Sequence, residues 1–229
     1  MRIMQAFFVT GTDTDVGKTV ISAGLMLALT QHGHSVIGHK PISAGCELVI
    51  EDGEAGLHNE DALALMAQAS VQLPYEWVNP IAFAQPIAPH IAADMAHQAI
   101  DTAVLDEALA RLQQVDADVL LVEGAGGWAL PIGNGKLLSE WVAKHQLPVV
   151  IVVALRLGCL NHALLTYQAV KASGCDVLGW VANDFCDQPF AQENIKTLKS
   201  MLDAPCLGVV GKVSRAEEVA AQLDVKALG

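Results

Sequence analysis

The feature that most restricts the fold is the alternation of short apolar runs with segments of helical periodicity. The runs are rich in Val, Ile and Leu and lack period-2 alternation, which indicates strands covered on both faces. We expect strands at residues 6–10, 35–39, 119–123, 149–154, 177–182 and 206–210. We expect helices at 17–31, 60–70, 102–114, 137–145, 160–173 and 190–202, with a last helix near 215–224. The sequence therefore predicts an α/β fold with helices on both faces of a parallel sheet.

The chain is expected to form a single domain over residues 1–229, because no internal repeat, low-complexity tract or linker divides it. In such folds, ligands bind beyond the carboxyl ends of the strands. Residues 73–100 break the alternation, with several prolines and little periodicity. Loops of this length inside a domain are usually functional or disordered. The apolar content favours an ordered loop on the ligand-binding face.

The charge balance and the cysteines exclude several classes of protein. Lys and Arg number 13 against 25 Asp and Glu, so the net charge is −12. Nucleic-acid binders meet phosphates with clustered Lys and Arg, so we expect no nucleic-acid partner. The longest apolar runs, such as 148–155, are too short to span a bilayer, and we expect no membrane partner. The five cysteines form no CxxC pair, which argues against a structural zinc site and fits a reducing cytoplasm.

A phosphate-binding loop is the strongest motif. The sequence GTDTDVGKT, residues 11–19, follows the first expected strand and begins the first expected helix. Such a loop presents backbone N–H groups to an anion, while Lys18 reaches the β- and γ-phosphates and Thr19 ligates Mg²⁺. The spacing departs from GxxxxGK[ST], because Gly11 comes one residue early and Thr12 stands at the usual glycine position. The competing interpretation is a chance GKT in a solvent-exposed turn.

Two carboxylates are candidates for holding magnesium, which prefers oxygen ligands. Glu123 ends an apolar strand and is followed by the small residues 124–127. Asp61 follows Asn59 at the start of a helix. Glu123 could instead be a solvated acid at a strand end, and Asp61 an ordinary acid in a first helical turn, where the macrodipole favours it.

Lys40 is a candidate for a second cation at the phosphates. It follows the strand expected at 35–39, and Pro41 keeps it out of a helix. A positive charge at the carboxyl end of a strand suits a transferring phosphoryl group. A solvent-exposed lysine is the competing interpretation.

Taken together, these residues resemble the dethiobiotin synthetases of biotin biosynthesis, a family of the P-loop NTPase superfamily. The matching motifs fall in order at residues 11–19, 40–41, 59–65, 86, 89–90, 122–128, 157–162 and 179–183. They cover about residues 5–185, and the ordered set is far more specific than the GKT alone.

The resemblance implies an ATP-dependent ring closure. 7,8-Diaminononanoate, CO₂ and MgATP would give dethiobiotin, ADP and phosphate. One substrate amine takes up CO₂ as a carbamate, and a carbamate oxygen attacks the γ-phosphate. The second amine then closes on the mixed anhydride, which forms the cyclic urea and expels phosphate. Such chemistry needs Mg²⁺ and lysines more than a protein nucleophile.

The resemblance also implies a role for each matching residue. Lys18 and Lys40 would be catalytic, and Lys40 would also attract the carbamate. Thr19, Asp61 and Glu123 would hold Mg²⁺. The remaining nucleotide-binding residues would be Asp15, Val16, Gly17, Val20, Gly124, Ala125, Gly126, Asn183 and Asp184. The substrate carboxylate would be bound, across the interface of a homodimer, by Arg156, Leu157, Gly158, Cys159, Leu160 and Asn161.

This sequence departs from the family pattern at two places. Family members often carry a hydroxyl at the position of Ala44, whereas this chain has Ser43 next to it. The adenine-side segment commonly reads Gly-x-x-Pro and here ends in Gly211. The departures leave open which hydroxyl meets the substrate and how residues 208–213 select the nucleotide. Asn183 is still expected to read the adenine edge.

Three other classes remain as alternatives. A regulatory ATPase of the ParA/MinD type would share the fold, but it usually has a lysine early in the phosphate loop and a basic membrane- or DNA-binding surface. A related amide-forming ligase usually carries a glutaminase domain, for which 229 residues leave no room. The third alternative is a module that binds ATP without turning it over, against which Lys40 and Glu123 argue.

Overall fold

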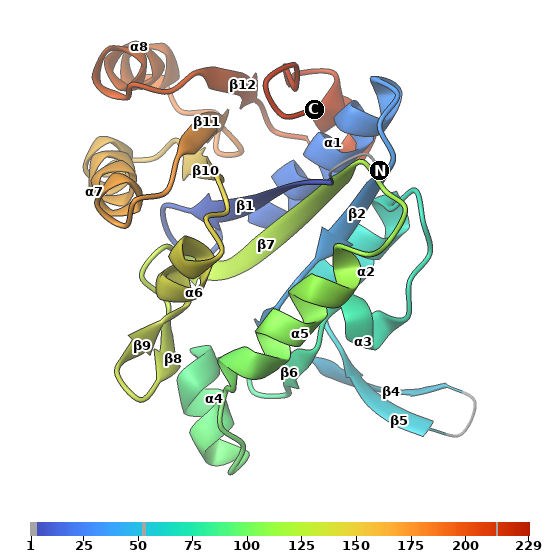
Figure 1. Cartoon of the computed structure of the whole chain (residues 1–229). Helices are drawn as coiled ribbons and strands as arrows, with labels where there is room; N and C mark the ends of the chain where they lie inside the picture. The colour runs from blue at the N-terminus through green and yellow to red at the C-terminus, as the bar shows by residue number, and fades with distance from the viewer. Residues whose placement is uncertain (1–3, 52–53, 214) are drawn as a thin grey trace.

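A six-stranded parallel sheet forms the centre of the molecule (Figure 1). The computed structural model describes residues 4–51, 54–213 and 215–229, so the first three residues of the expected domain lie outside it. The strand order is β12-β11-β10-β1-β7-β2. The bounds are β1 (Gln5–Gly11), β2 (Val36–His39), β7 (Val119–Gly127), β10 (Val149–Ala154), β11 (Val177–Asn183) and β12 (Cys206–Val210).

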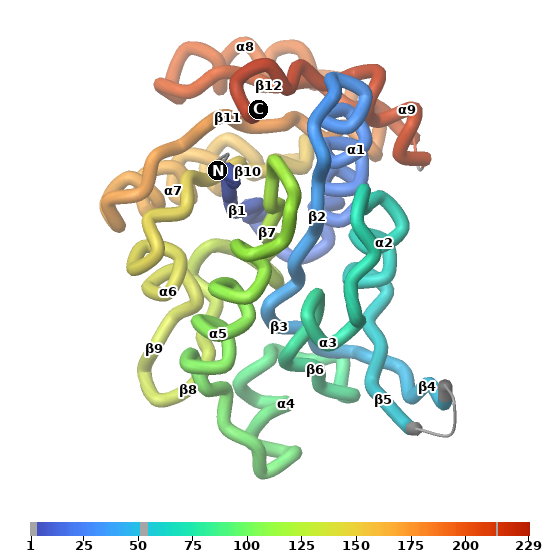
Figure 2. Tube along the Cα trace, turned by 45° about the vertical axis from the view of Figure 1, so that its right-hand side comes forward, coloured from blue at the N-terminus to red at the C-terminus, as the bar shows by residue number. Residues whose placement is uncertain are grey.

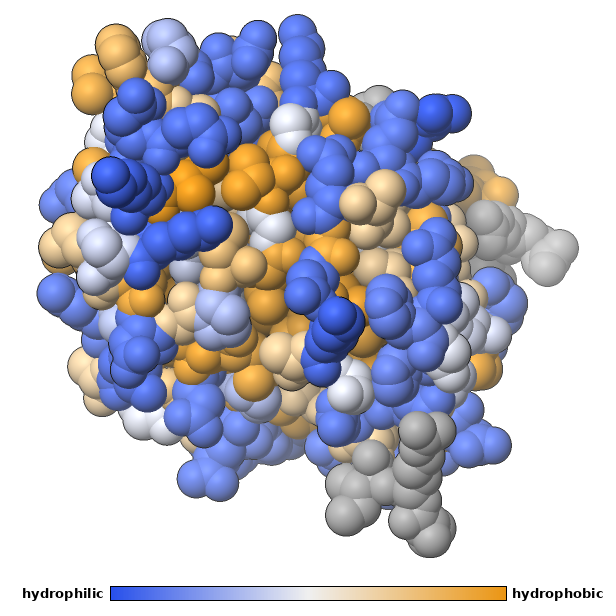
Figure 3. All heavy atoms as spheres, turned by 90° about the horizontal axis from the view of Figure 1, so that it is seen from above, coloured by the Kyte–Doolittle hydropathy of each residue, from blue (hydrophilic) through white to orange (hydrophobic). Residues whose placement is uncertain are grey.

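Helices cover both faces of the sheet, and each face has its own apolar core. One core lies under α1 (Lys18–Gln31), α2 (Glu60–Gln68) and α9 (Ala216–Ala220). The other lies under α5 (Thr102–Leu112), α6 (Leu138–Lys144), α7 (Cys159–Ala172) and α8 (Ala191–Met201). Neighbouring residues of β1, Phe7 and Phe8, belong to different cores, because successive side chains of a strand point to opposite faces. Seen from above, the rim of the molecule is mostly hydrophilic, and many hydrophobic residues lie nearer the middle (Figure 3).

The predicted fold class, the six strands of the parallel sheet and the seven helices are confirmed, with small shifts at their ends. The largest shifts are in the last helix, which covers only Ala216–Ala220, and in β7, which continues to Gly127, so Glu123 lies within that strand and not at its end. The prediction of one long loop over 73–100 was wrong in part. The segment is ordered, but it contains α3 (Tyr75–Val78), β6 (Ile81–Phe83) and α4 (Pro89–Met95). These elements are too short to show a period in the sequence.

Further short strands were not expected from the sequence. The parallel pair β3 (Ile42–Ala44) and β6 lies beside α3 (Figure 2). The antiparallel hairpin β4 (Glu47–Glu51) and β5 (Glu54–His58) projects from the body of the molecule. A second hairpin joins β8 (Pro131–Gly133) to β9 (Lys136–Leu137). In the part of the chain that the structure describes, no helix is long and apolar enough to cross a membrane.

Candidate functional site

Three neighbouring strands end at the same edge of the sheet and carry the expected charged residues. β1 runs into the phosphate loop, β7 contains Glu123, and β2 leads into Lys40. β7 lies between β1 and β2, with all three parallel. Parallel strands end at one edge, so residues far apart in the sequence meet there.

The phosphate loop wraps tightly from β1 into α1. An added Cβ at Gly11 would lie 2.6 Å from Val16 Cγ2, so the early glycine allows the longer loop to fold back on itself. Gly17 has a φ of 83°, which favours glycine, and an added Cβ there would lie 2.2 Å from Asn183 Nδ2. Lys18 begins α1 and is 8% exposed. Its Nζ donates to the carbonyl of Asp13 at 3.4 Å.

Thr19, Lys40, Asp61 and Glu123 form one compact group, here called the carboxylate cluster. Lys40 Nζ lies 2.6 Å from Asp61 Oδ2 and 2.7 Å from Glu123 Oε1. Thr19 Oγ1 lies 2.6 Å from Asp61 Oδ1 and 3.0 Å from Glu123 Oε1. Lys40 Nζ also donates to the carbonyl of Gly124 at 3.2 Å. Lys40 and Glu123 are fully or almost fully buried, which rules out a solvent-exposed lysine and a solvated strand-end acid.

The charges of the cluster shift one another's pKa values. Burial alone would lower the pKa of Lys40, but the carboxylates of Glu123 and Asp61 outweigh burial and raise it. Burial alone would raise the pKa of Asp61, but Lys40 and the Thr19 hydroxyl hold it below its ordinary value. Burial, helped by the charge of Lys40, lowers the pKa of Lys18. The cluster therefore keeps the Lys40 ammonium and the Asp61 carboxylate charged although burial opposes both.

The cluster fits a magnesium ion. Two carboxylates and a hydroxyl are oxygen ligands of the kind that Mg²⁺ takes beside phosphate oxygens and waters. Glu123 Oε2 is buried and has no hydrogen-bond partner, so it has an acceptor free for a cation or a metal-bound water. Among the described residues, no group of three or more His, Cys, Asp or Glu could hold a metal ion. The cluster itself offers two carboxylates and the Thr19 hydroxyl.

A cavity of about 790 Å³ opens beside the cluster. Most of its walls come from the phosphate loop and from residues near Lys40. The described residues that line it include Thr14, Asp15, Gly17, Lys18, Thr19, Val20, Lys40, Ser43, Ala44, Asp61, Ala125 and Gly126. Residues 86–89 of the segment 73–100 also line it, which places part of that segment on the face where the loop was expected.

Asn183 and Asp184 lie at the end of β11, on the other side of the phosphate loop. Asn183 is 5% exposed, and its Nδ2 donates to the carbonyl of Val16 at 2.9 Å. The Asp184 carboxylate accepts from the backbone amide of Gln188 at 2.9 Å. Asn183 therefore contacts the loop directly, whereas the side chain of Asp184 is turned toward its own turn.

Residues 156–161 lie at the start of α7 and do not line the cavity. Arg156 pairs with Asp13 of the phosphate loop at 2.5 Å. Leu157 is fully exposed, and Gly158 precedes the helix with a φ of 95°. The structure of one chain therefore does not bring this segment together with the carboxylate cluster.

Sequence reasoning missed two polar residues near Lys40, Asn79 and Tyr75, and it named Ser43 without its partners. Asn79 and Ser43 are buried, and Tyr75 joins them through its hydroxyl group. The only signal in the sequence was a polar residue, Asn79, between apolar neighbours and Pro80, inside the segment interpreted as a loop.

Comparison with known proteins places the chain in a family. Residues 5–220 match a family model described as an AAA domain. The ATP-dependent dethiobiotin synthetase BioD of Aeromonas salmonicida is 45% identical over 229 residues, with 99% of this chain and 100% of the relative covered. The protein of the same name from Pseudomonas aeruginosa (strain UCBPP-PA14) is 48% identical over 230 residues, with 99% of each chain covered.

Solved structures agree on the fold. The MinC:MinD cell division protein complex of Aquifex aeolicus matches with a TM-score of 0.55 at 15% identity, over 96% of this chain and 87% of that chain. Cell division protein FtsY of Thermotoga maritima matches with a TM-score of 0.52 at 17% identity, over 94% of this chain and 64% of that chain. These likenesses support the P-loop fold alone, whereas the two relatives are similar along their full length. The chain belongs to the family of ATP-dependent dethiobiotin synthetases.

Proposed function

We propose that this protein converts 7,8-diaminononanoate, CO₂ and ATP to dethiobiotin, ADP and phosphate. The observation that carries the proposal is the carboxylate cluster: a buried lysine and two carboxylates beside the phosphate loop, at the wall of a cavity of about 790 Å³. A reaction that gathers anionic phosphates and an anionic carbamate needs such positive charge and positioning more than it needs a nucleophile.

The nucleotide would bind with its phosphates over the N-terminus of α1. Backbone amides of residues 15–20 would bind the phosphates there, and Lys18 would supply a cation next to the β- and γ-phosphates. Asn183, on the opposite side of the loop, would bind the adenine edge, next to Asp184 and the chain near 211–213. Ala125 and Gly126 line the cavity and would let the phosphates approach β7, whereas an added Cβ at Gly124 would meet the Phe8 ring.

Lys40 would act on the transferring group. Its Nζ reaches the carbamate and the γ-phosphoryl oxygens from the side of β2, opposite Lys18. Developing negative charge on these oxygens is stabilised by an ammonium that is already in place. The second amine would then attack the carbonyl carbon of the mixed anhydride, and phosphate would leave toward the two lysines.

Thr19, Asp61 and Glu123 would hold a magnesium ion. Bound there, Mg²⁺ would neutralise charge on the β- and γ-phosphate oxygens. Glu123 supplies its unpartnered Oε2, and Asp61 supplies a carboxylate whose lowered pKa keeps it charged at neutral pH.

The substrate carboxylate would be bound by residues 156–161 of a second copy of the chain. These residues lie outside the cavity of their own chain, and Leu157 is fully exposed. The start of α7 carries a partial positive charge, which suits a carboxylate, although the amide of Cys159 already donates to the carbonyl of Arg156 at 2.9 Å. We therefore propose a homodimer with shared sites, in the cytoplasm, without nucleic acid or membrane as a partner.

One experiment tests the reaction directly. The protein is incubated with diaminononanoate, ¹³C-bicarbonate and MgATP, and the product is analysed by mass spectrometry. We expect dethiobiotin that carries one ¹³C. We also expect that phosphate release requires both diaminononanoate and bicarbonate. Phosphate release without these two compounds would instead favour a regulatory ATPase of the ParA/MinD type, whose fold the chain shares.

A further inference from the structure

A buried polar network holds the backbone of Lys40 in place, and part of it lines the cavity. Its centre is Asn79, which follows α3 and is 3% exposed. The Asn79 amide group donates to the carbonyl of Lys40 at 2.7 Å and to that of Ile81 at 3.3 Å. The backbone amide of Lys40 donates to the carbonyl of Val78 at 2.7 Å. Val78 and Asn79 therefore hold the peptide groups on both sides of Lys40.

The other end of Asn79 leads to Asp61. Asn79 Oδ1 accepts from the hydroxyls of Ser43 at 2.7 Å and Tyr75 at 2.8 Å. The Tyr75 hydroxyl accepts from the backbone amide of Asn59 at 2.7 Å. Asn59 in turn caps α2 by accepting from the amide of Asp61 at 3.1 Å. One chain of hydrogen bonds thus joins the backbone of Lys40 to the helix end that carries Asp61.

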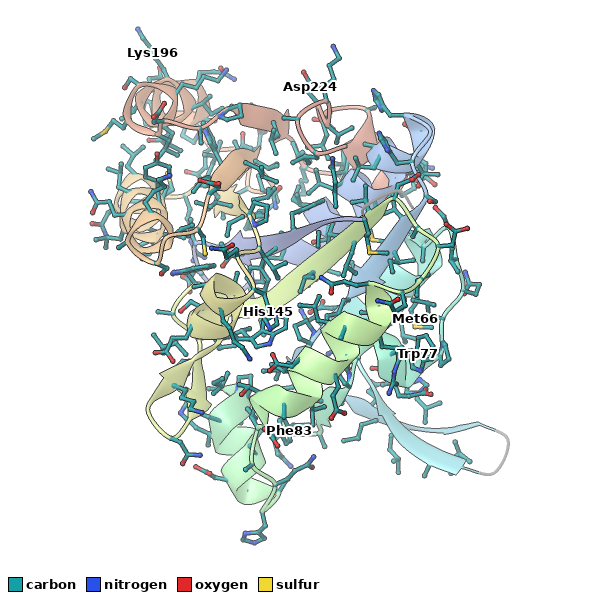
Figure 4. All side chains as sticks on the ribbon, in the orientation of Figure 1. Met66, Trp77, Phe83, His145, Lys196 and Asp224 are labelled. Carbon is teal, nitrogen blue, oxygen red and sulfur yellow. The ribbon has the colours of Figure 1, made fainter. Side chains whose placement is uncertain are left out.

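The short helix α3 that supports this network is fixed from two sides. The Tyr75 ring stacks on His58, with centroids 4.0 Å apart and planes at 20°. The guanidinium of Arg111 lies 5.0 Å from the ring centre of Trp77. Figure 4 shows Trp77 beside α5, which carries Arg111. Residues 75–79 are therefore a rigid support, although the helix has only four residues.

We propose that Asn79 is a positioning residue, linked through Tyr75, that sets Lys40 and Asp61 at the separation that phosphoryl transfer needs. The lysine stem is long and flexible, so the place of Nζ depends on where the backbone of Lys40 is held. Asn79 holds that backbone, and the same side chain is tied to the cap of α2. The expected effect on turnover rests on the proposed function. The expected effect on the position of Lys40 does not rest on it.

Two variants test the network. Tyr75→Phe removes only the hydroxyl that joins Asn59 to Asn79. Asn79→Asp keeps the size and the acceptor but removes the donors to Lys40 and Ile81. Tyr167→Phe is the matched control, because its hydroxyl contacts only the carbonyl of Asp203, at 3.3 Å. Thermal melting identifies folded variants, and Tyr75→Phe carries the test if Asn79→Asp does not fold.

The first readout is acetylation of Lys40 by limiting acetic anhydride, measured by peptide mass spectrometry against the exposed Lys196. Figure 4 shows Lys196 pointing away from the molecule. Labelling of Lys40 relative to Lys196 should rise several-fold in Tyr75→Phe and Asn79→Asp and stay at the wild-type level in Tyr167→Phe. This measurement needs no enzymatic activity, so it remains valid even if the proposed function fails.

The second readout separates turnover from nucleotide binding. We expect kcat to fall about tenfold in both variants, because a misplacement of about 1 Å costs that much or more. The Kd for MgATP should stay within about twofold, since Lys18 and the loop are not in the network. Three results would overturn the proposal. They are unchanged labelling of Lys40 in a folded variant, an unchanged kcat, and a Kd for MgATP that rises by as large a factor as kcat falls.

Discussion

At the scale of single residues, the site is defined by which charges are buried together. Glu123 is fully buried, and its charge is balanced by Lys40 at 2.7 Å. The cost of burying a carboxylate is large unless it is paired or binds a metal. The uncompensated acceptor Oε2 indicates that a further positive partner belongs there.

Replacing Glu123 with Gln keeps the shape and removes the charge. We expect kcat to fall about 100-fold or more, while the Kd for ATP changes much less, because the charge acts mainly in the transition state. Steady-state kinetics at saturating Mg²⁺ and equilibrium binding of ATP measure the two quantities. Glu140→Gln, an exposed acid in the first turn of α6, is the control and should behave as wild type. Near-normal turnover of Glu123→Gln would remove Glu123 from the metal site.

The two lysines should fail in different ways. Lys18→Ala should weaken ATP binding together with rate, because Lys18 lies in the loop. Lys40→Ala should lower kcat and raise the KM for bicarbonate or diaminononanoate more than the KM for ATP, because it acts on the transferring group. Kinetics with each substrate varied in turn distinguish the two patterns. If Lys40→Ala left kcat and all KM values unchanged, Lys40 would have only a structural role in its ion pairs.

His39 gives the fold a measurable pH dependence. Burial lowers the pKa of His39 to about 4, and its Nε2 is buried without a partner. The unfolded chain binds this proton below about pH 6.5, whereas the folded chain binds it only below about pH 4. The contribution of His39 to stability is therefore complete above about pH 6.5 and is lost as the pH falls toward 4, by up to about 1.4 kcal/mol per pH unit.

His39→Asn tests this, since the amide can still donate to the carbonyl of Val78, which lies 2.9 Å from Nδ1 in the wild type. Urea unfolding between pH 4 and 7 should show a smaller loss of stability on acidification for the variant than for the wild type. His97→Asn is the control: the position is exposed, and Asn tolerates its φ of 53°. If the free energy of unfolding fell equally with decreasing pH in wild type and His39→Asn, the prediction would be wrong.

At the scale of elements, the phosphate loop depends on backbone geometry rather than on side chains. Gly17 has a positive φ and also lies against Asn183, whereas Gly33, at the end of α1, has a positive φ of 90° and nothing near an added Cβ. The two positions share a positive φ, but only Gly17 lies in the phosphate loop and against another side chain. The pair therefore separates backbone strain from the effect of packing on the loop.

Gly17→Ala should weaken ATP binding by at least tenfold and lower the Tm by more than Gly33→Ala does. Backbone strain at a positive φ costs about 1 kcal/mol at either position, and the clash with Asn183 adds to it only at residue 17. Calorimetric titration with ATP and thermal melting measure the two effects. Similar losses in both variants would mean that the contact with Asn183 is unimportant.

At the scale of the whole molecule, the separation of residues 156–161 from the cavity makes assembly decisive. Mixing two inactive variants tests a shared site: Lys18→Ala and Gly158→Trp. After subunit exchange, about half of the dimers are mixed and one of their two sites is intact, so about a quarter of wild-type activity should return. If each site lies within one chain, both sites of a mixed dimer carry a defect. No recovery, once exchange has been shown by mass, would reject the shared site.

The sequence by itself determined the parallel sheet, its helices and the phosphate loop, because their signals are local. Apolar runs without alternation define β1, β7 and β10, and GKT between a strand and a helix defines the loop. The elements of residues 73–100 were not predictable, since strands and helices of three to seven residues depend on tertiary contacts.

Only the tertiary structure decided that Thr19, Lys40, Asp61 and Glu123 make one cluster. Their contacts span 21 to 104 residues of sequence and depend on β7 lying between β1 and β2. Strand order is a property of the packed sheet, which no local pattern encodes. The support of Lys40 by Asn79 is hidden for the same reason, because the hydrogen bond joins residues 39 apart. Local periodicity determines the elements, and long-range packing determines which charges meet.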